Sequence, residues 1–278
     1  MGCPCEVLVD STDRKLAELV VALARDEAWR IEKKWSRYLH NSLVEHINRS
    51  AGSHITVDDE TARMIDFSES LFKLSDGVFD ITSGVLRKIW NFNPDSKLPL
   101  QKEIDAIMSK VGWGKVYWQS PVIRLGEGMQ LDFGGIGKEY AVDQCVNILA
   151  KYDVSVLINF GGDIACTNAP RNSEGWLVGI DGSSGQSNNH RMITLSKGAI
   201  ASSGDTYRYL EYRGKRYSHI LDARTGWPVD DSPASVTVIA DTCTTAGMLT
   251  TLAQTQGANA ENFLIEQSVE YFIEPAHH

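Results

Sequence analysis

Cysteine is scarce in this chain of 278 residues, and its pattern excludes a disulfide framework. The five thiols are an odd number and are spread along the chain, at Cys3, Cys5, Cys145, Cys166 and Cys243. Cys3 and Cys5 are separated by one residue, and no second Cys/His pair offers zinc-ligand spacing with them. We therefore expect small thiols that are buried or at an edge, rather than metal ligands.

Long apolar runs and basic runs are also missing. No stretch is long and apolar enough to cross a bilayer, and the start does not resemble a secretory signal. Glu6 stands where N-myristoylation needs Ser or Thr. The formal net charge of −9, with no Lys/Arg run, argues against binding to nucleic-acid phosphates. As written, the sequence predicts a cytoplasmic protein without a nucleic-acid partner.

No internal repeat or low-complexity linker divides the chain, so we expect a single domain over residues 1–278. Apolar residues at helical spacing predict helices over residues 12–38, 58–74, 136–151 and 244–256. Ser11 or Thr12 is the expected cap of the first helix, and Gly257 is expected to stop the last one.

Short apolar runs bounded by turn-forming residues predict strands. They cover residues 6–10, 155–160, 176–180, 191–195, 199–202, 235–240 and 269–273. Asp181-Gly182 predicts a tight turn, and Arg213-Gly214 predicts a hairpin between residues 207–212 and 215–220. Helices and strands do not alternate strictly, which favours an α+β fold with a mixed sheet and helices packed on its faces.

A glycine-rich run, LDFGGIGKEYAVD at residues 131–143, leads into the third predicted helix. Glycines let a ligand approach the backbone, and the helix start offers free N–H groups and a positive dipole end. This arrangement suits a phosphate or pyrophosphate, to which Lys138 would add a positive charge. The spacing is neither a dinucleotide-binding GxGxxG nor a P-loop, and such a run by itself is more often only a turn.

Other segments carry weaker signals. Asp163 follows a Gly-Gly pair directly after a strand and could cap or orient a neighbour. His219 lies three residues before Asp222 and suits general base chemistry near neutral pH, although an isolated His is more often structural. The aromatic-rich turn at residues 77–82 could cover a flat ring, although such aromatics are more often core.

Taken together and in this order, the motifs resemble those of the FAD:protein FMN transferases, the ApbE-like family. The matches are a start like MGT at residues 1–3, Ser36, Tyr38, Ser42 and Asn48, GaFDxT at 77–82 with Trp90 and Phe92, LDxGGIxKGYAVD at 131–143, NxGGD at 159–163, SSGD at 202–205, and HIIDPRTGxP at 219–228. Glu139 replaces a Gly of the pattern, and Leu221 and Ala223 are minor changes. Each motif is weak alone, but the ordered set covers nearly the whole chain.

The resemblance implies an ApbE-like, T-fold-related architecture of mixed sheets and packed helices, with an FAD cleft between two halves. In such proteins Mg²⁺ sits on the pyrophosphate of FAD, and the FMN half is transferred to a Thr or Ser of a target flavoprotein, releasing AMP. Some relatives hydrolyse FAD to FMN and AMP instead. The chemistry is phosphoryl transfer.

The resemblance also implies roles for individual residues. Those expected at the flavin nucleotide are Met1, Tyr38, Phe79 and Asp80, and those expected to line the FAD cleft are Gly134, Lys138, Tyr140 and Ile220. His219 is the candidate for proton handling, with Asp222 holding its loop. The backbone carbonyl of Gly137 and the side chain of Thr251 are the expected metal ligands.

One metal-ligand position departs from the family. The family helix motif Ala-Asp-x-x-x-Thr places Asp and Thr at i and i+4, so that both face the ion. Here Thr251 is kept, but Gly247 stands at the Asp position, and Cys243 is a poor magnesium ligand. Another carboxylate such as Asp241 or Asp163 could substitute, water could fill the gap, or Mg²⁺ would bind weakly.

Four functions remain open from the sequence. They are a Mg²⁺-dependent FMN transferase, a non-catalytic protein that binds or delivers FAD, an FAD pyrophosphatase, and a scaffold without a ligand. Retention of His219 and Thr251 favours the transferase, whereas Gly247 favours the binder. Many relatives are exported lipoproteins, so an envelope location is expected instead if a leader has been removed from this chain.

Overall fold

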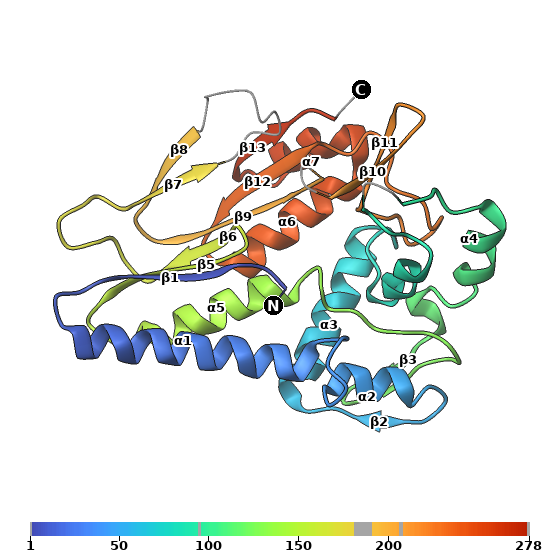
Figure 1. Cartoon of the computed structure of the whole chain (residues 1–278), viewed down its shortest axis with the longest axis horizontal. Helices are drawn as coiled ribbons and strands as arrows, with labels where there is room; N and C mark the ends of the chain where they lie inside the picture. Colours follow the sequence, from blue (N-terminus) through green and yellow to red (C-terminus); the bar gives the residue numbers. More distant parts are fainter. Residues whose placement is uncertain (1, 94–95, 181–190, 206–207, 277–278) are drawn as a thin grey trace.

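A computed structural model describes residues 2–93, 96–180, 191–205 and 208–276. Its centre is a six-stranded sheet (Figure 1). The strands, in their order across the sheet, are β1 (Cys5–Asp10), β5 (Ser155–Phe160), β6 (Asp163–Cys166), β9 (Gly198–Gly204), β12 (Ser235–Ala240) and β13 (Glu270–Glu274).

Neighbouring strands of this sheet pair antiparallel throughout, so the α+β class is confirmed but the expected mixed sheet is wrong. At β5 and β6 the reason is local. Gly161 and Gly162, at φ of 66° and 98°, form a two-residue turn, which can join only antiparallel strands.

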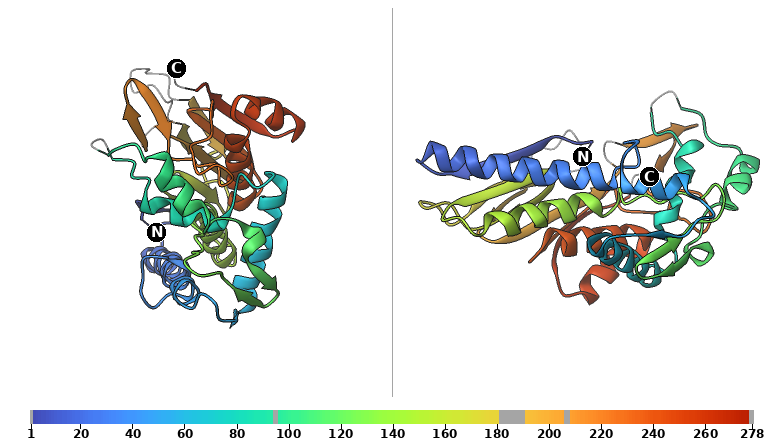
Figure 2. Two further views of the ribbon diagram at one scale, coloured as in Figure 1. Left: turned by 90° about the vertical axis from the view of Figure 1, so that its right-hand side faces the viewer. Right: turned by 90° about the horizontal axis from the view of Figure 1, so that it is seen from below.

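Helices cover one face of the sheet and a hairpin covers the other. Helices α5 (Gly137–Leu149) and α6 (Cys243–Thr255) pack on the sheet, and α1 (Arg14–Trp35) runs alongside α5 and β1 (Figure 2). The hairpin of β7 (Trp176–Ile180) and β8 (Arg191–Leu195) forms a separate core on the opposite face.

Strand β5 is therefore buried from both sides. Val156 and Ile158 belong to the core beneath the helices, whereas Leu157 belongs to the core beneath β7 and β8. Because both faces are covered, the strand is nearly continuously apolar rather than alternating.

Most of the remaining elements lie at the right of Figure 1, and the last two, η3 and α7, follow α6 in the chain. They are α2 (Leu43–Arg49), β2 (Ile55–Thr56), α3 (Asp59–Leu74), η1 (Ile81–Lys88), α4 (Gln101–Met108), η2 (Trp113–Lys115), β3 (Tyr117–Gln119), β4 (Val122–Arg124), β10 (Tyr209–Tyr212), β11 (Lys215–Ser218), η3 (Gly257–Asn259) and α7 (Ala260–Glu266). Trp90 is buried there, stacked on Phe92, and its indole N–H donates to the carbonyl of Gly226 at 2.8 Å, so it is a core residue.

The four predicted helices are present as α1, α3, α5 and α6, and the Arg213-Gly214 hairpin is confirmed as β10 and β11. The predicted cap of α1 is wrong: the carboxylate of Asp13, not Ser11 or Thr12, accepts from the backbone N–H groups of Lys15 and Leu16. Helices α2, α4 and α7 and strand β6 were not predicted, because each is too short to show a clear period. The predicted Asp181-Gly182 turn lies outside the described residues.

The five thiols are free. Cys145, Cys166 and Cys243 are buried, Cys3 is half-buried, and Cys5 is exposed on the edge strand β1. The expectation of buried or edge thiols is therefore confirmed. Within the described ranges, the structure also contains no helix that is both long and apolar enough to span a bilayer.

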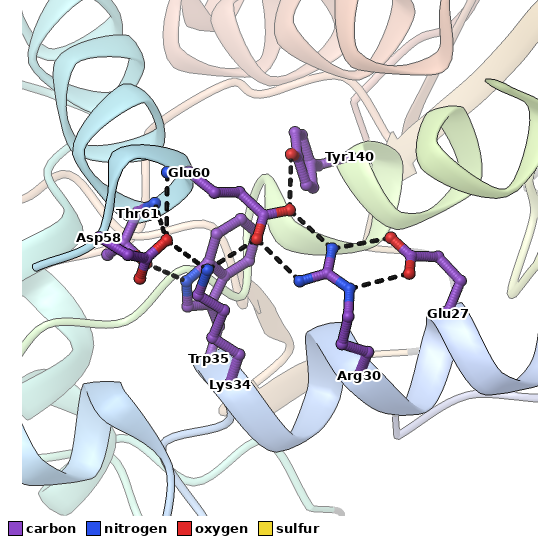
Figure 3. A network of polar contacts seen from close by, with 8 residues as sticks. All are labelled: Glu27, Arg30, Lys34, Trp35, Asp58, Glu60, Thr61 and Tyr140. Carbon is purple, nitrogen blue, oxygen red and sulfur yellow. Dashed lines mark hydrogen bonds and ion pairs between the residues drawn. The ribbon is translucent and has the colours of Figure 1, made fainter. Parts of the chain in front are cut away.

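Helices α1, α3 and α5 are joined by a polar network, which we refer to as the helix network (Figure 3). Its members are Glu27, Arg30, Lys34, Asp58, Glu60 and Tyr140. The Glu60 carboxylate accepts from Arg30 at 2.7 Å, from Lys34 at 2.6 Å and from the Tyr140 hydroxyl at 2.8 Å. The hydrogen bond from Arg30 is the main cause that lowers the pKa of Glu60 to about 2.

Candidate functional site

A cavity of about 540 Å³ lies at the N-terminal end of α5, within the size range of small-molecule sites. It is lined by Gly2, Cys3, Ile31, Glu32, Trp35, Ser36, Arg37, Tyr38, Leu39, Arg87, Asp132, Phe133, Gly134, Gly137, Lys138, Gly161 and Arg208. Residues at the end of α1 and in the glycine-rich run thus line the same cavity.

The glycine-rich run is held by one internal hydrogen bond and by Asn48 of α2. The Asp132 carboxylate accepts from the N–H of Gly134 at 2.8 Å. The Asn48 amide donates to the carbonyl of Leu131 at 3.1 Å and accepts from its N–H at 2.6 Å. Because the chain then enters α5 at Gly137, the held backbone presents a helix N-terminus to the cavity, which favours an anion.

Four cationic side chains line the same cavity: Arg37, Arg87, Lys138 and Arg208. Arg37 is committed to the Asp132 carboxylate at 3.0 Å. Lys138 makes a short ion pair with the buried carboxylate of Asp163. Burial lowers the pKa of Lys138, but the charges of Asp163 and Glu139 raise it by more, so Lys138 stays protonated at neutral pH. Cations at a helix N-terminus suit a phosphate group.

Four of the predicted ligand residues meet at this cavity: Tyr38, Gly134, Gly137 and Lys138. Tyr38 is 73% exposed, and its ring lies 5.7 Å from the Arg37 guanidinium carbon. An aromatic ring left open at the mouth of a cavity can stack on a flat ligand. Met1 lies outside the described residues.

His219 adjoins the cavity through Arg208. Its Nδ1 lies 3.0 Å from the backbone carbonyl of Arg208, and because a carbonyl only accepts, Nδ1 carries the hydrogen and Nε2 keeps a lone pair. Burial, followed by the positive charge of Arg208, lowers the pKa of His219 to about 4. His219 is therefore neutral at pH 7 and can take up a proton at Nε2.

The loop that follows His219 is held by Asp222. The Asp222 carboxylate accepts from the backbone N–H of Arg224 at 2.8 Å and pairs with its guanidinium at 2.9 Å. Its carbonyl accepts from the N–H of Gly226 at 2.8 Å. Ile220 is half-buried, and its carbonyl accepts from the N–H of Val229.

Phe79, Asp80 and Tyr140 are not part of the cavity lining. Asp80 is buried and accepts from two backbone N–H groups, those of Thr82 and Trp113, both at 2.7 Å; it also lines a second cavity of about 500 Å³. The Tyr140 hydroxyl belongs to the helix network (Figure 3). Phe79 is half-buried, with its ring against Gly135. Their contacts hold the elements around the glycine-rich run.

Glu139, which follows Lys138 in the first turn of α5, is buried against Gly247 of α6. A Cβ added to Gly247 would lie 2.5 Å from Cγ of Glu139 and 3.1 Å from its Oε1. Only 7% of Glu139 is exposed, and within the described residues its Oε2 has no hydrogen-bond partner. Burial, then the negative charge of Asp163, raises the pKa of Glu139 to about 8.

Comparison with known proteins decides the family. The sequence profile of the ApbE family matches residues 1–273. The chain belongs to the ApbE family. This confirms the resemblance inferred from the ordered motifs.

Related ApbE proteins cover most of the chain. An FAD:protein FMN transferase of Klebsiella pneumoniae is 29% identical over 266 residues, covering 91% of this chain and 79% of that protein. One of Haemophilus influenzae is 26% identical over 256 residues, covering 87% and 73%. The ApbE protein of Thermotoga maritima has a TM-score of 0.84 at 29% identity, over 98% of this chain and 91% of that one.

The ApbE pattern makes Gly247 and Glu139 notable, because each departs from it. The sequence analysis did not identify Glu139 as a candidate site residue. The available signal was that one departure adds a carboxylate and the other removes one. Thr251 lies on α6 four residues after Gly247 and is half-buried. Within the described residues, no three His, Cys, Asp or Glu side chains form a metal cluster, so a cation here would also need backbone or hydroxyl oxygens.

Proposed function

We propose that this ApbE-family chain transfers the FMN moiety of FAD, through a phosphoester bond, to a Thr or Ser hydroxyl of a target flavoprotein and releases AMP. The observation that carries the proposal is the cationic cavity at the N-terminus of α5 beside the neutral imidazole of His219. The names of the relatives, FAD:protein FMN transferases, support it.

Different residues of the cavity would bind the pyrophosphate and the flavin of FAD. Lys138, Arg208 and the backbone of Gly134 would hold the pyrophosphate, because they present positive charge and N–H groups at a helix start. The exposed ring of Tyr38 would cover the flavin.

The chemical step needs a base and an in-line nucleophile. Nε2 of His219 would accept the proton of the acceptor Thr or Ser hydroxyl. At the same time, the oxygen of that hydroxyl would form a bond to the FMN phosphorus. The bond between that phosphorus and the bridging oxygen breaks, and AMP leaves with this oxygen. The lowered pKa of His219 keeps the imidazole in its basic form over the physiological range.

A hard divalent cation such as Mg²⁺ fits the residues beside this cavity. The unpartnered, buried Oε2 of Glu139 is an oxygen that a cation would satisfy, and oxygen donors are what Mg²⁺ prefers. The carbonyl of Gly137 and the hydroxyl of Thr251 are the further ligands that we propose. Bound there, Mg²⁺ would neutralise charge on the phosphate oxygens.

The test is incubation with FAD, MgCl₂ and a flavoprotein domain that carries an acceptor Thr, with the Thr-to-Val form of that domain as control. AMP together with covalent flavin on the first domain alone supports the proposal. AMP with free FMN indicates an FAD pyrophosphatase, and tight FAD binding with neither product indicates a binding or delivery protein. His219→Asn should retain FAD binding and lose transfer.

A further inference from the structure

Two departures from the ApbE pattern meet in space. Glu139 adds a carboxylate to α5 where the pattern has Gly, and Gly247 removes one from α6 where the pattern has Asp. We infer that the two form a reciprocal exchange: Glu139 supplies to the divalent cation, from α5, the carboxylate that position 247 no longer supplies. The inference rests on the proposed Mg²⁺-dependent function.

The packing of α5 on α6 shows why the exchange must be reciprocal. A Cβ at position 247 would approach Cγ of Glu139 to 2.5 Å, well inside ordinary contact distance. Cγ is not the free end of the side chain, and Glu139 is buried, so it has little room to move aside. Gly247 is therefore the residue that makes room for Glu139.

In its ionised form, the buried Glu139 side chain would need a cation beside it. A buried carboxylate is costly unless hydrogen bonds or a positive charge compensate it. Oε2 of Glu139 has no partner within the described residues, and Asp163 and Asp143 add negative charge nearby. The neighbouring cation, Lys138, is in a short ion pair with Asp163.

Of the other carboxylates near the starts of α5 and α6, Asp143 and Asp163 are bonded to protein groups and Asp241 is exposed. The two oxygens of Asp143 accept from the N–H groups of Cys243 and Thr244 and so hold the start of α6. Asp163 pairs with Lys138, and Asp241 is exposed. Glu139 therefore fits the role of substitute ligand better than Asp163 or Asp241, the two that the sequence had indicated.

The exchange reverses the simple expectation for position 247. Restoring the family Asp alone, in Gly247→Asp, would force a second carboxylate against Glu139 rather than repair the site. Only the double variant Glu139→Gly/Gly247→Asp would restore the family arrangement.

The experiment is a double-mutant cycle read by Mn²⁺ binding, using electron paramagnetic resonance of free Mn²⁺ with and without FAD, and by the Mg²⁺-induced rise in Tm. We expect Glu139→Gly and Gly247→Asp each to weaken Mn²⁺ binding at least about tenfold. The double variant should recover to within about threefold of the parent, because it again has one carboxylate at the site.

Glu139→Gln is the variant least able to disturb the fold, because it keeps the shape of the side chain and removes its charge. It should lose Mn²⁺ binding while its Tm without metal is maintained or raised. Asp241→Asn, which neutralises an exposed carboxylate nearby, is the matched control and should bind Mn²⁺ as the parent does.

The outcomes separate the inference from the proposed function. Parent-like Mn²⁺ binding by Glu139→Gln, or a folded double variant that does not recover, overturns the exchange even if flavin transfer is observed. A cycle that behaves as expected, in a protein that transfers no flavin, supports the metal site and contradicts the transferase.

Discussion

Glu60 and Glu139 are two carboxylates of this molecule with opposite surroundings. Glu60, in the helix network, accepts from Arg30, Lys34 and Tyr140, and its pKa falls to about 2 (Figure 3). Glu139 is buried one residue before Tyr140 on α5, has one oxygen without a partner in the described structure, and its pKa rises to about 8. We therefore assign Glu60 to the stability of the fold, whereas the unpartnered oxygen of Glu139 is the basis of its proposed role as a cation ligand.

The largest expected difference between the two regions concerns their lysines. Lys138→Met would leave the buried Asp163 without its ion pair, and we expect a loss of about 3–5 kcal/mol in the free energy of unfolding. Lys34→Met should cost only about 1 kcal/mol, because Glu60 keeps its hydrogen bonds from Arg30 and Tyr140 and the Asp58 carboxylate is already partly in water. Urea unfolding at pH 7 measures both, and equal losses would contradict the contrast.

A compensating change provides the control for this result. Lys138→Met/Asp163→Asn removes the uncompensated charge together with its partner, so most of the lost stability should return. If the double variant is as unstable as Lys138→Met, the loss reflects packing of the lysine stem rather than the charge.

Gly247→Ala tests the packing around Glu139. Gly to Ala inside a helix normally stabilises by about 1 kcal/mol, but here the new methyl meets Cγ of Glu139, and we expect a loss of about 1–3 kcal/mol. Gly137→Ala is the matched control, because a Cβ there lies 3.9 Å from Cβ of Phe133 and should be neutral or stabilising. A rise in unfolding free energy for Gly247→Ala would show that Glu139 moves aside freely.

The contribution of Glu60 to stability should depend on pH, which tests the other carboxylate of the comparison. Its pKa is about 2 in the folded protein against 4.5 ordinarily, so its stabilising contribution is present above pH 4.5 and is lost as the pH falls towards 2. After allowance for partial exposure, Glu60→Gln should cost on the order of 1–2 kcal/mol at pH 7. Urea unfolding at pH 7 and pH 2.5 should show this cost shrinking, whereas exposed Glu18→Gln should show little change at either pH.

The smallest expected effect concerns the pKa of His219. Burial is the main cause that lowers this pKa, and the positive charge of Arg208 is the second. Its imidazole should titrate near pH 4, and Arg208→Gln should raise that pKa only slightly. Ring-resonance titration by NMR measures both. A return to the ordinary value of 6.5 in Arg208→Gln would make charge, not burial, the principal cause.

The sequence predicts the long elements and the family well, because periodic apolar runs and ordered motifs are local signals. Helices α1, α3, α5 and α6 carry several turns of amphipathic pattern. The glycine-rich run before α5 can be recognised from its residues alone as a possible phosphate site. Short α2 and α7 carry too few residues for a period, and strand β6 was hidden because its start, Asp163, looked like part of a turn.

The site was only partly predictable for a different reason. Tyr38, Gly134, Gly137 and Lys138, which the motifs marked as ligand residues, line one cavity, and their roles there stay a prediction. The relation between Glu139 and Gly247 depends on how α5 packs on α6, which no local pattern determines. The two residues are distant in sequence and become informative only when the interhelical contact is known.

The clamp between Asn48 and Leu131 has a consequence for the entropy of binding. Fixing the backbone of one residue costs about 1–2 kcal/mol, and a glycine-rich run has the most freedom to lose. Because Asn48 already holds both polar groups of Leu131, much of this ordering takes place when the protein folds rather than when a ligand arrives. If the cavity binds a phosphate as proposed, Asn48 would contribute to its affinity although it does not line the cavity, because less ordering of the run would remain to be paid on binding.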